Sequence, residues 1–196
     1  MQLHKADLVD AAAALLDTYG IADLTMRRLA RELDVSPGAL YWHFPNKQAL
    51  LGAVADRILR GVDDAPGDWR DRVGQVGARL RDALLSHTDG AELVSASFAA
   101  GQSAATTRIV AYLSAAAADA GLAGEQAELA ARTVVYYVLG FTADEQSRLQ
   151  WDAAGALPDG QSVLTTDPSA RFTFGLRLLV DGIGPRETAV SHAKCE

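Results

Sequence analysis

The sequence contains a single cysteine among 196 residues, and this Cys195 lies one residue from the end. An intrachain disulfide is therefore impossible, and there is no cysteine cluster to bind zinc. No apolar run approaches the roughly 20 residues that a membrane-spanning helix needs, and the first residues lack the apolar segment of a signal peptide. We therefore expect a cytoplasmic protein that has no membrane contact.

Residue patterns typical of enzymes are also missing. The chain has no glycine-rich phosphate loop and no nucleophile elbow, and its four histidines are not paired at metal-binding spacing. We therefore expect no enzymatic activity, no cofactor and no bound metal. A helical interaction module that does not bind DNA remains an alternative at this point.

Positive charge is scarce overall, because the formal net charge is -7. That value taken alone argues against a nucleic-acid partner, since phosphate binding needs local positive potential. Within residues 1–60, however, seven basic and seven acidic residues balance, so the whole deficit belongs to residues 61–196. Hydrophobic residues make up 49% of the chain, which is enough for one or two compact domains.

Apolar residues recur at three- and four-residue spacing along nearly the whole chain, and no stretch alternates convincingly with period two. The sequence therefore predicts an all-α fold. We divide the chain into an N-terminal domain (1–60), a linker (61–67), a second helical domain (68–184) and a flexible tail (185–196). In the second domain we expect helices at about 68–86, 91–100, 105–120, 124–148 and 168–180, with a loop over 151–168.

The N-terminal domain has clear start and stop signals for helices. The first helix should bury one face and end at Gly20, a residue that tolerates the left-handed conformation; the face is formed by Leu8, Ala12, Leu15, Leu16 and Tyr19. A second helix should start near Thr25. Ser36 and Pro37 fit the cap and first position of a short third helix, and Asn46 should cap a fourth over about 47–60. Two helices joined by a tight turn predict either a helix-turn-helix or an ordinary helical hairpin.

The residues of this region decide between the two. The chain reads LTMRRLA over 24–30, LDVSPGALYWHF over 33–44 and NK at 46–47. This combination resembles the DNA-binding region of the tetracycline-repressor (TetR) family. The resemblance implies an N-terminal three-helix helix-turn-helix domain that binds double-stranded operator DNA. It also implies a C-terminal helical domain that forms a homodimer and binds a small-molecule inducer.

Arg27 is our candidate for base readout, because an arginine can bond guanine O6 and N7 together and the resemblance places a base-contacting arginine there. Leu40 and Phe44 should pin the recognition helix to the domain, while Gly38 and Ala39 allow close approach to base edges. Arg28 and Arg31 are expected either to balance Glu32 and Asp34 or to touch phosphate. The remaining candidate DNA contacts are Thr25, Ser36, Pro37, Tyr41, Trp42, His43 and Lys47.

The resemblance extends into the second domain, through ALLSHTDGA over 83–91, LGFTADEQ over 139–146 and Phe174-Gly175-Leu176. These strings are similar to the tetracycline repressors themselves, which bind their drug as a magnesium chelate. The residues that grip the drug in those proteins correspond here to Asp63, Val76, Leu80 and Val94, and only the acidic position, Asp144, keeps its type. His87 is expected to fix a turn rather than bind a ligand.

Replacement of polar contacts by Val76, Leu80 and Val94 predicts a largely apolar inducer. Its possible neighbours are Ser97, Phe98, Ile109, Tyr112 and Tyr136, although helical spacing would equally place these residues in the core. For a four-helix dimer interface we propose two faces, which are formed by Ala127, Ala130, Ala131, Val134 and Val138 and by Phe172, Leu176, Leu179 and Val180. The whole sequence indicates a ligand-released repressor of a palindromic operator; a drug-responsive repressor of an efflux gene and an activator remain alternatives.

Tetracycline-magnesium should not be the inducer, because one carboxylate at Asp144 without its partner ligands is a poor site for a hard ion. We expect calorimetry to detect no tetracycline binding that depends on magnesium. Micromolar binding that disappears on chelation of magnesium would contradict this hypothesis.

Overall fold

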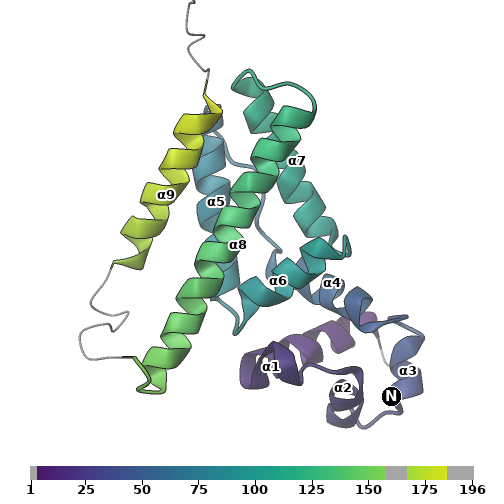
Figure 1. The fold of residues 1–196 in the computed structure, drawn as a ribbon. Coiled ribbons are helices and arrows are strands. Elements are labelled where there is room, and N and C mark those ends of the chain that lie inside the picture. Colours follow the sequence, from purple (N-terminus) through teal and green to yellow (C-terminus); the bar gives the residue numbers. More distant parts are fainter. Residues whose placement is uncertain (1–3, 158–166, 185–196) are drawn as a thin grey trace, which may run out of the picture.

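The computed structural model describes residues 4–157 and 167–184, and all regular structure in these two ranges is helical. Helices near the N-terminus form a separate head below the body (Figure 1). The head comprises α1 (Lys5–Asp23), α2 (Met26–Glu32), α3 (Pro37–Tyr41) and α4 (Lys47–Ile58). The expected helix-turn-helix is therefore present, with α2 and α3 as its two helices.

Side-chain caps fix where the short helices of the head begin. The Thr25 side chain accepts a hydrogen bond from the Arg28 backbone N–H at 3.1 Å, and Ser36 accepts one from Ala39 at 3.3 Å. Asn46 caps α4 in the same way, 2.8 Å from the backbone nitrogen of Ala49. These three residues were predicted to start helices because their short polar side chains satisfy free backbone N–H groups, and each of them does so.

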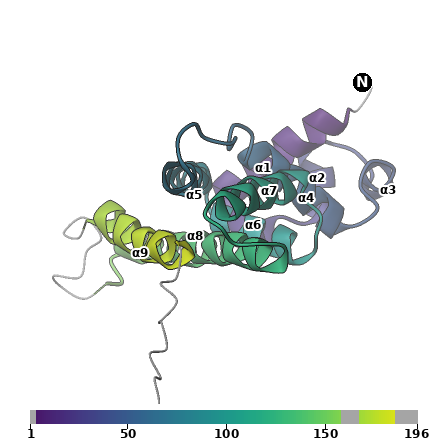
Figure 2. The ribbon, with the colours of Figure 1, turned by 90° about the horizontal axis from the view of Figure 1, so that it is seen from above.

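The body contains five further helices, which are α5 (Trp69–Leu85), α6 (Gly90–Ala99), α7 (Ala104–Asp119), α8 (Glu125–Ala153) and α9 (Pro168–Ile183). The long α8 is central, because it packs against α5, α6, α7 and α9. Seen from above, α8 and α9 form one row along a side of the body, and α5 and α7 form a second row beside it (Figure 2). None of the helices in the described ranges is long and apolar enough to cross a membrane.

Several predicted boundaries and faces were wrong. Tyr19 is half exposed rather than buried with the rest of its face. Gly20 breaks the helical geometry at φ 77°, but the helix resumes and ends at Asp23. The loop expected from Trp151 starts later, because α8 continues to Ala153. The central part of that loop and the expected tail over 185–196 lie outside the described residues.

The predicted dimer faces on α8 and α9 were also wrong. Most of their residues are buried within the single chain, with exposed fractions of 8% or less: Ala127, Ala131, Val134, Val138, Phe172, Leu176 and Val180. Their spacing correctly indicated an apolar face, but α5 and α7 of the same chain are packed against these two helices. A second set of apolar residues remains exposed on α8 and α9, and it is formed by Leu129, Tyr136, Phe174 and Leu178.

One buried ion pair fastens α5 to α8. The Arg81 guanidinium bonds both carboxylate oxygens of Glu145, at 2.9 and 2.7 Å, and each residue is only 7% exposed. The same guanidinium lies over the ring of Phe172 in α9. Because paired charges with two hydrogen bonds offset much of their desolvation, the pair is tolerated in the core.

Removing one partner should leave an uncompensated buried charge. We expect Glu145→Ala to lower the free energy of unfolding by roughly 3 kcal/mol, measured by urea denaturation at fixed protein concentration. The matched control is Glu128→Ala, which breaks the exposed pair with Arg132 on the same helix and should cost less than about 1 kcal/mol. Equal losses in the two variants would contradict the role of the buried pair.

Candidate nucleic-acid interface and its connection to the body

The recognition helix α3 is short and is held from one side. Leu40 and Phe44 are 0% and 1% exposed, as predicted for the residues that pin it to the head. Beside them, Tyr41 and Trp42 are 50% and 90% exposed. A large aromatic side chain with almost no protein contact indicates a surface that meets a partner. Ser36, Pro37 and Gly38 at the start of α3 are exposed, and Ala39 and His43 are half-buried.

The arginines of α2 differ in their surroundings. Arg27 is exposed, as base readout requires. Arg28 instead bonds the Asp23 carboxylate at 2.6 Å, and its guanidinium lies 3.8 Å from the centre of the Tyr19 ring. The sequence predicts that Arg28 balances Glu32 or Asp34 or touches phosphate. Its observed partners belong to α1, so Arg28 links the end of α1 to the start of α2.

Lys47 is the first residue of α4 and is half-buried. Its charge lies at the positive end of that helix, where backbone N–H groups already favour an anion. At the other end of the same helix, Arg57 pairs with Asp10 at 2.6 Å. Among the described residues of the head, Arg28 and Arg57 are held in ion pairs, whereas Arg27, Lys47, Arg31 and Arg60 are not.

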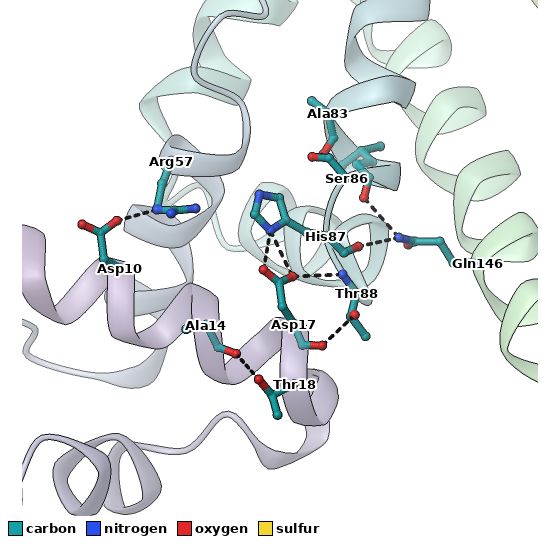
Figure 3. Close-up of polar contacts among 11 residues, drawn as sticks. Asp10, Ala14, Asp17, Thr18, Arg57, Ala83, Ser86, His87, Thr88 and Gln146 are labelled. Carbon is teal, nitrogen blue, oxygen red and sulfur yellow. Dashed lines mark hydrogen bonds and ion pairs between the residues drawn. The ribbon is translucent and has the colours of Figure 1, made fainter.

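The head is joined to the body where α1 meets the turn between α5 and α6, shown in Figure 3. Both Asp17 carboxylate oxygens lie 3.0 Å from Nδ1 of His87. The same carboxylate accepts a bond from the Thr88 backbone N–H at 3.1 Å, and the Thr88 hydroxyl donates to the Asp17 carbonyl at 3.0 Å. His87 therefore fixes this turn, as predicted, and does so by bonding to the head.

Asp89 bridges three helices from the same turn. It adopts a left-handed backbone (φ 52°) before α6, but its side chain does not cap that helix. One carboxylate oxygen accepts from the Ile21 backbone N–H at 3.0 Å, and the other from the Gln150 side chain at 2.7 Å. Gly20 lies so close that a Cβ there would sit 2.6 Å from Asp89 Oδ2.

A second connection runs from α4 to the loop between α6 and α7. Asp56 accepts hydrogen bonds from the Ser103 hydroxyl at 2.7 Å and from the Ala105 backbone N–H at 2.8 Å. Gly52 packs against the carbonyl of Gln102, where any Cβ would collide. Sequence reasoning missed Asp17, Asp56 and Asp89 because their partners are distant in the chain. Only Asp89-Gly90 carried a local signal, as a turn pair.

The linker between head and body is also held by charge. Arg72 bonds Asp64 at 2.9 Å and Asp119 at 2.6 Å, joining the linker to α5 and α7. Partial burial acts to raise the pKa of the Asp64 carboxyl, but the hydrogen bonds from Arg72 and from the Ala65 N–H outweigh it and hold that pKa below its usual value. The predicted linker is therefore an anchored loop.

The predicted inducer-binding residues do not line a common site: some are buried in the core and others are exposed. Four of them are packed in the core at 1% or 2% exposure, namely Val76, Leu80, Val94 and Ile109. Asp63 and Asp144 are exposed, and Tyr112 is half-buried. Phe98 and Tyr136 contact each other, with ring centres 5.6 Å apart, and Phe98 lines an open groove of about 310 Å³ between α6, α7 and α8. Ser97 is buried beside Phe98.

This geometry defines a class of protein: a DNA-binding regulator whose helix-turn-helix head is attached to a helical body. Residues 8–54 match the family model for bacterial regulatory proteins of the TetR family, and residues 63–158 match the tetracyclin repressor-like C-terminal domain. The tetracycline repressor protein class G of Vibrio anguillarum is 31% identical over 96% of this chain and 97% of its own length.

Solved structures agree with this assignment. Mycobacterium smegmatis BioQ is 62% identical, with a TM-score of 0.86 over 93% of this chain and 98% of its own. BioQ in a crystal with its natural double-stranded DNA operator is 59% identical, with a TM-score of 0.82 over 94% of this chain and 100% of its own. The chain belongs to the TetR family. It is a ligand-responsive transcriptional repressor of that family and not an enzyme.

The close approach at Gly20 generates a prediction. Its φ of 77° and ψ of 174° suit only glycine, and a methyl group would also press on Asp89. Gly20→Ala should therefore lower the free energy of unfolding by about 1–3 kcal/mol and speed hydrogen exchange of the Ile21 amide. Gly61→Ala is the matched control, because Gly61 also has a positive φ but open space around it. Unchanged Ile21 exchange in Gly20→Ala would refute the contact.

Proposed function

We propose that this repressor binds a palindromic operator as a homodimer, with α3 of each head in the major groove, and that a small molecule in the body releases it. The observation that carries the proposal is the surface of α3. Its inner side chains are fully buried, while Tyr41 and Trp42 project beside an exposed N-terminal turn. A DNA-binding protein of this kind acts where the chromosome lies, so we also expect a cytoplasmic location.

We assign sequence readout and backbone contact to different residues. Arg27 reads a base, because it is exposed and we find no acidic partner for it among the described residues. Gly38 and Ala39 bring α3 close to the base edges. We assign the contacts to sugar and phosphate to residues at the helix starts and at the end of α3. These residues are Thr25, Ser36, Pro37, Tyr41, Trp42, His43 and Lys47. Arg28 positions α2 through Asp23 and Tyr19 rather than contacting DNA directly.

The exposed side of α8 and α9 is our candidate for the dimer interface. Leu129 and Tyr136 on α8 and Phe174 and Leu178 on α9 are each more than half exposed. Such a patch on neighbouring helices is typical of a protein-protein interface. Pairing two copies here would form a four-helix bundle with twofold symmetry, which places the two heads on two operator half-sites.

We propose on chemical grounds that tetracycline-magnesium is not the inducer. Asp144 is exposed on α8 whereas Val94 is 1% exposed in the core, so the two positions do not offer a shared set of oxygen ligands. We propose a largely apolar inducer instead. A tetracycline-type drug is the second candidate, and the likeness to the class G tetracycline repressor favours it. Activation of transcription is a further alternative, with no specific structural observation in its favour.

The division of roles on DNA can be tested on an operator selected from random duplexes. Arg27→Ala should cost about 1–3 kcal/mol and relax selection at one base pair of each half-site. Lys47→Ala should weaken all sequences alike and reduce the dependence of affinity on salt. Both variants are measured by fluorescence anisotropy across a salt series. Uniform, equal losses from both, or enrichment of no palindrome at all, would contradict the proposal.

The dimer interface can be tested by placing a charge on α9. Leu178→Glu should yield monomers in sedimentation experiments and lose most of the operator affinity, because burying an unpaired carboxylate opposes association. Leu149→Glu is the matched control: Leu149 is also exposed, but it lies on the opposite face of α8 from Leu129. If Leu178→Glu sediments as wild type, the interface lies elsewhere.

A further inference from the structure

Hydroxyl groups within the helices of this protein follow a common pattern. Thr18 in α1 donates to the carbonyl of Ala14 at 2.8 Å, and Thr133 in α8 donates to that of Leu129 at 2.8 Å. Thr107 in α7 does the same with the carbonyl of Ser103. Bonding to the backbone four residues earlier is a common way for a helical serine or threonine to satisfy its hydroxyl.

Ser97 in α6 and Thr142 in α8 depart from this pattern. Their hydroxyl oxygens have no hydrogen-bond partner among the described residues, although the side chains are only 1% and 0% exposed. Burying a hydroxyl without a partner is unfavourable, and folded proteins satisfy nearly all such groups. Two unsatisfied hydroxyls in the core therefore call for a partner that the protein itself does not supply.

Both hydroxyls lie along the same helix pair. The Ala91 backbone N–H donates to the Gln146 side chain at 3.1 Å, and Phe98 contacts Tyr136. Since the residue number rises along α6 while it falls along α8, the two helices run antiparallel over this stretch. Ser97 and Thr142 both lie between these two contacts. The rest of the stretch is apolar, with Val94, Val138 and Leu139 all buried.

We propose that Ser97 and Thr142 are the polar anchors of the inducer site, and that the inducer is a compact neutral molecule carrying a hydroxyl, carbonyl or ether group on an apolar skeleton. This rests on the proposed function, in which the body binds an inducer. A charged ligand is disfavoured because the charged side chains that are buried among the described residues, Arg81 and Glu145, already pair with each other. The site also explains why an apolar stretch of the core contains two hydroxyls without partners.

The test uses three probes of similar size on the full chain: phenol, its apolar isostere fluorobenzene, and the charged benzoate. Binding is followed by ligand-observed NMR without DNA. We expect wild-type protein to bind phenol about tenfold more tightly than fluorobenzene, and benzoate not measurably. The double variant Ser97→Ala/Thr142→Val, which removes only the two hydroxyls, should bind phenol as weakly as fluorobenzene. Thr18→Val, which removes a satisfied hydroxyl in the head, should bind as wild type.

Equal affinity for phenol and fluorobenzene in the wild type, or an unchanged phenol preference in the double variant, would overturn the proposal and leave the hydroxyls as sites for buried water only. Thermal unfolding of the double variant confirms that it is folded, and we expect its stability to equal or exceed that of the wild type. Operator binding is measured separately. Failure to bind any operator would overturn the proposed function, whereas the NMR result would still decide whether the two hydroxyls hold a ligand.

Discussion

The position of the DNA-binding head depends on one buried carboxamide, that of Gln146 in α8. Its nitrogen donates to the carbonyls of Leu84 and His87, at 3.1 and 2.8 Å, and its oxygen accepts from the Ala91 N–H. One side chain thereby satisfies three backbone groups where α5 ends and α6 begins. Because helix ends leave such groups unpaired, this side chain holds the turn in a single shape against α8.

The turn between α5 and α6 in turn holds the head through hydrogen bonds to α1. Asp17 bonds to its His87 and Thr88, and Asp89 reaches back to the Ile21 amide. A second attachment, from Asp56 to the start of α7, fixes the other end of the head. Any change in α6 or α8 that alters these groups must also alter how the head is held. The two attachments therefore provide a physical connection between the body and the DNA-binding surface.

Neighbouring arginines on the surface of the head have different roles. Arg28, although it stands next to Arg27, is held by Asp23 and Tyr19 and stiffens the approach to α2. Arg27 is exposed and remains available to contact DNA. In a head with no net charge, such placement of the few free cations matters more than their number, because phosphate and base contacts depend on local potential.

The sequence alone was sufficient for the helix starts of the head and for the buried side of α3, although it misplaced the end of α1 and the exposure of Tyr19. Thr25, Ser36 and Asn46 act on backbone groups three residues away, and Leu40 and Phe44 are spaced one helical turn apart, so local physics determines helix starts and the buried side of α3. The strings around Arg27 and Trp42 were also specific enough to indicate the family. The sequence could not tell which apolar face of α8 is outward, because α8 carries two: Val134 and Val138 on one and Leu129 and Tyr136 on the other.

Only the tertiary structure decided that question and the attachment of the head. Hydrophobic periodicity shows that a helix has a face to bury, but it does not show which element covers that face. Likewise, Asp17 and His87 are 70 residues apart, and nothing near either residue in the chain indicates the other. Contacts of this kind arise when packed helices bring distant polar groups within hydrogen-bonding distance, and the packing of the whole chain determines them.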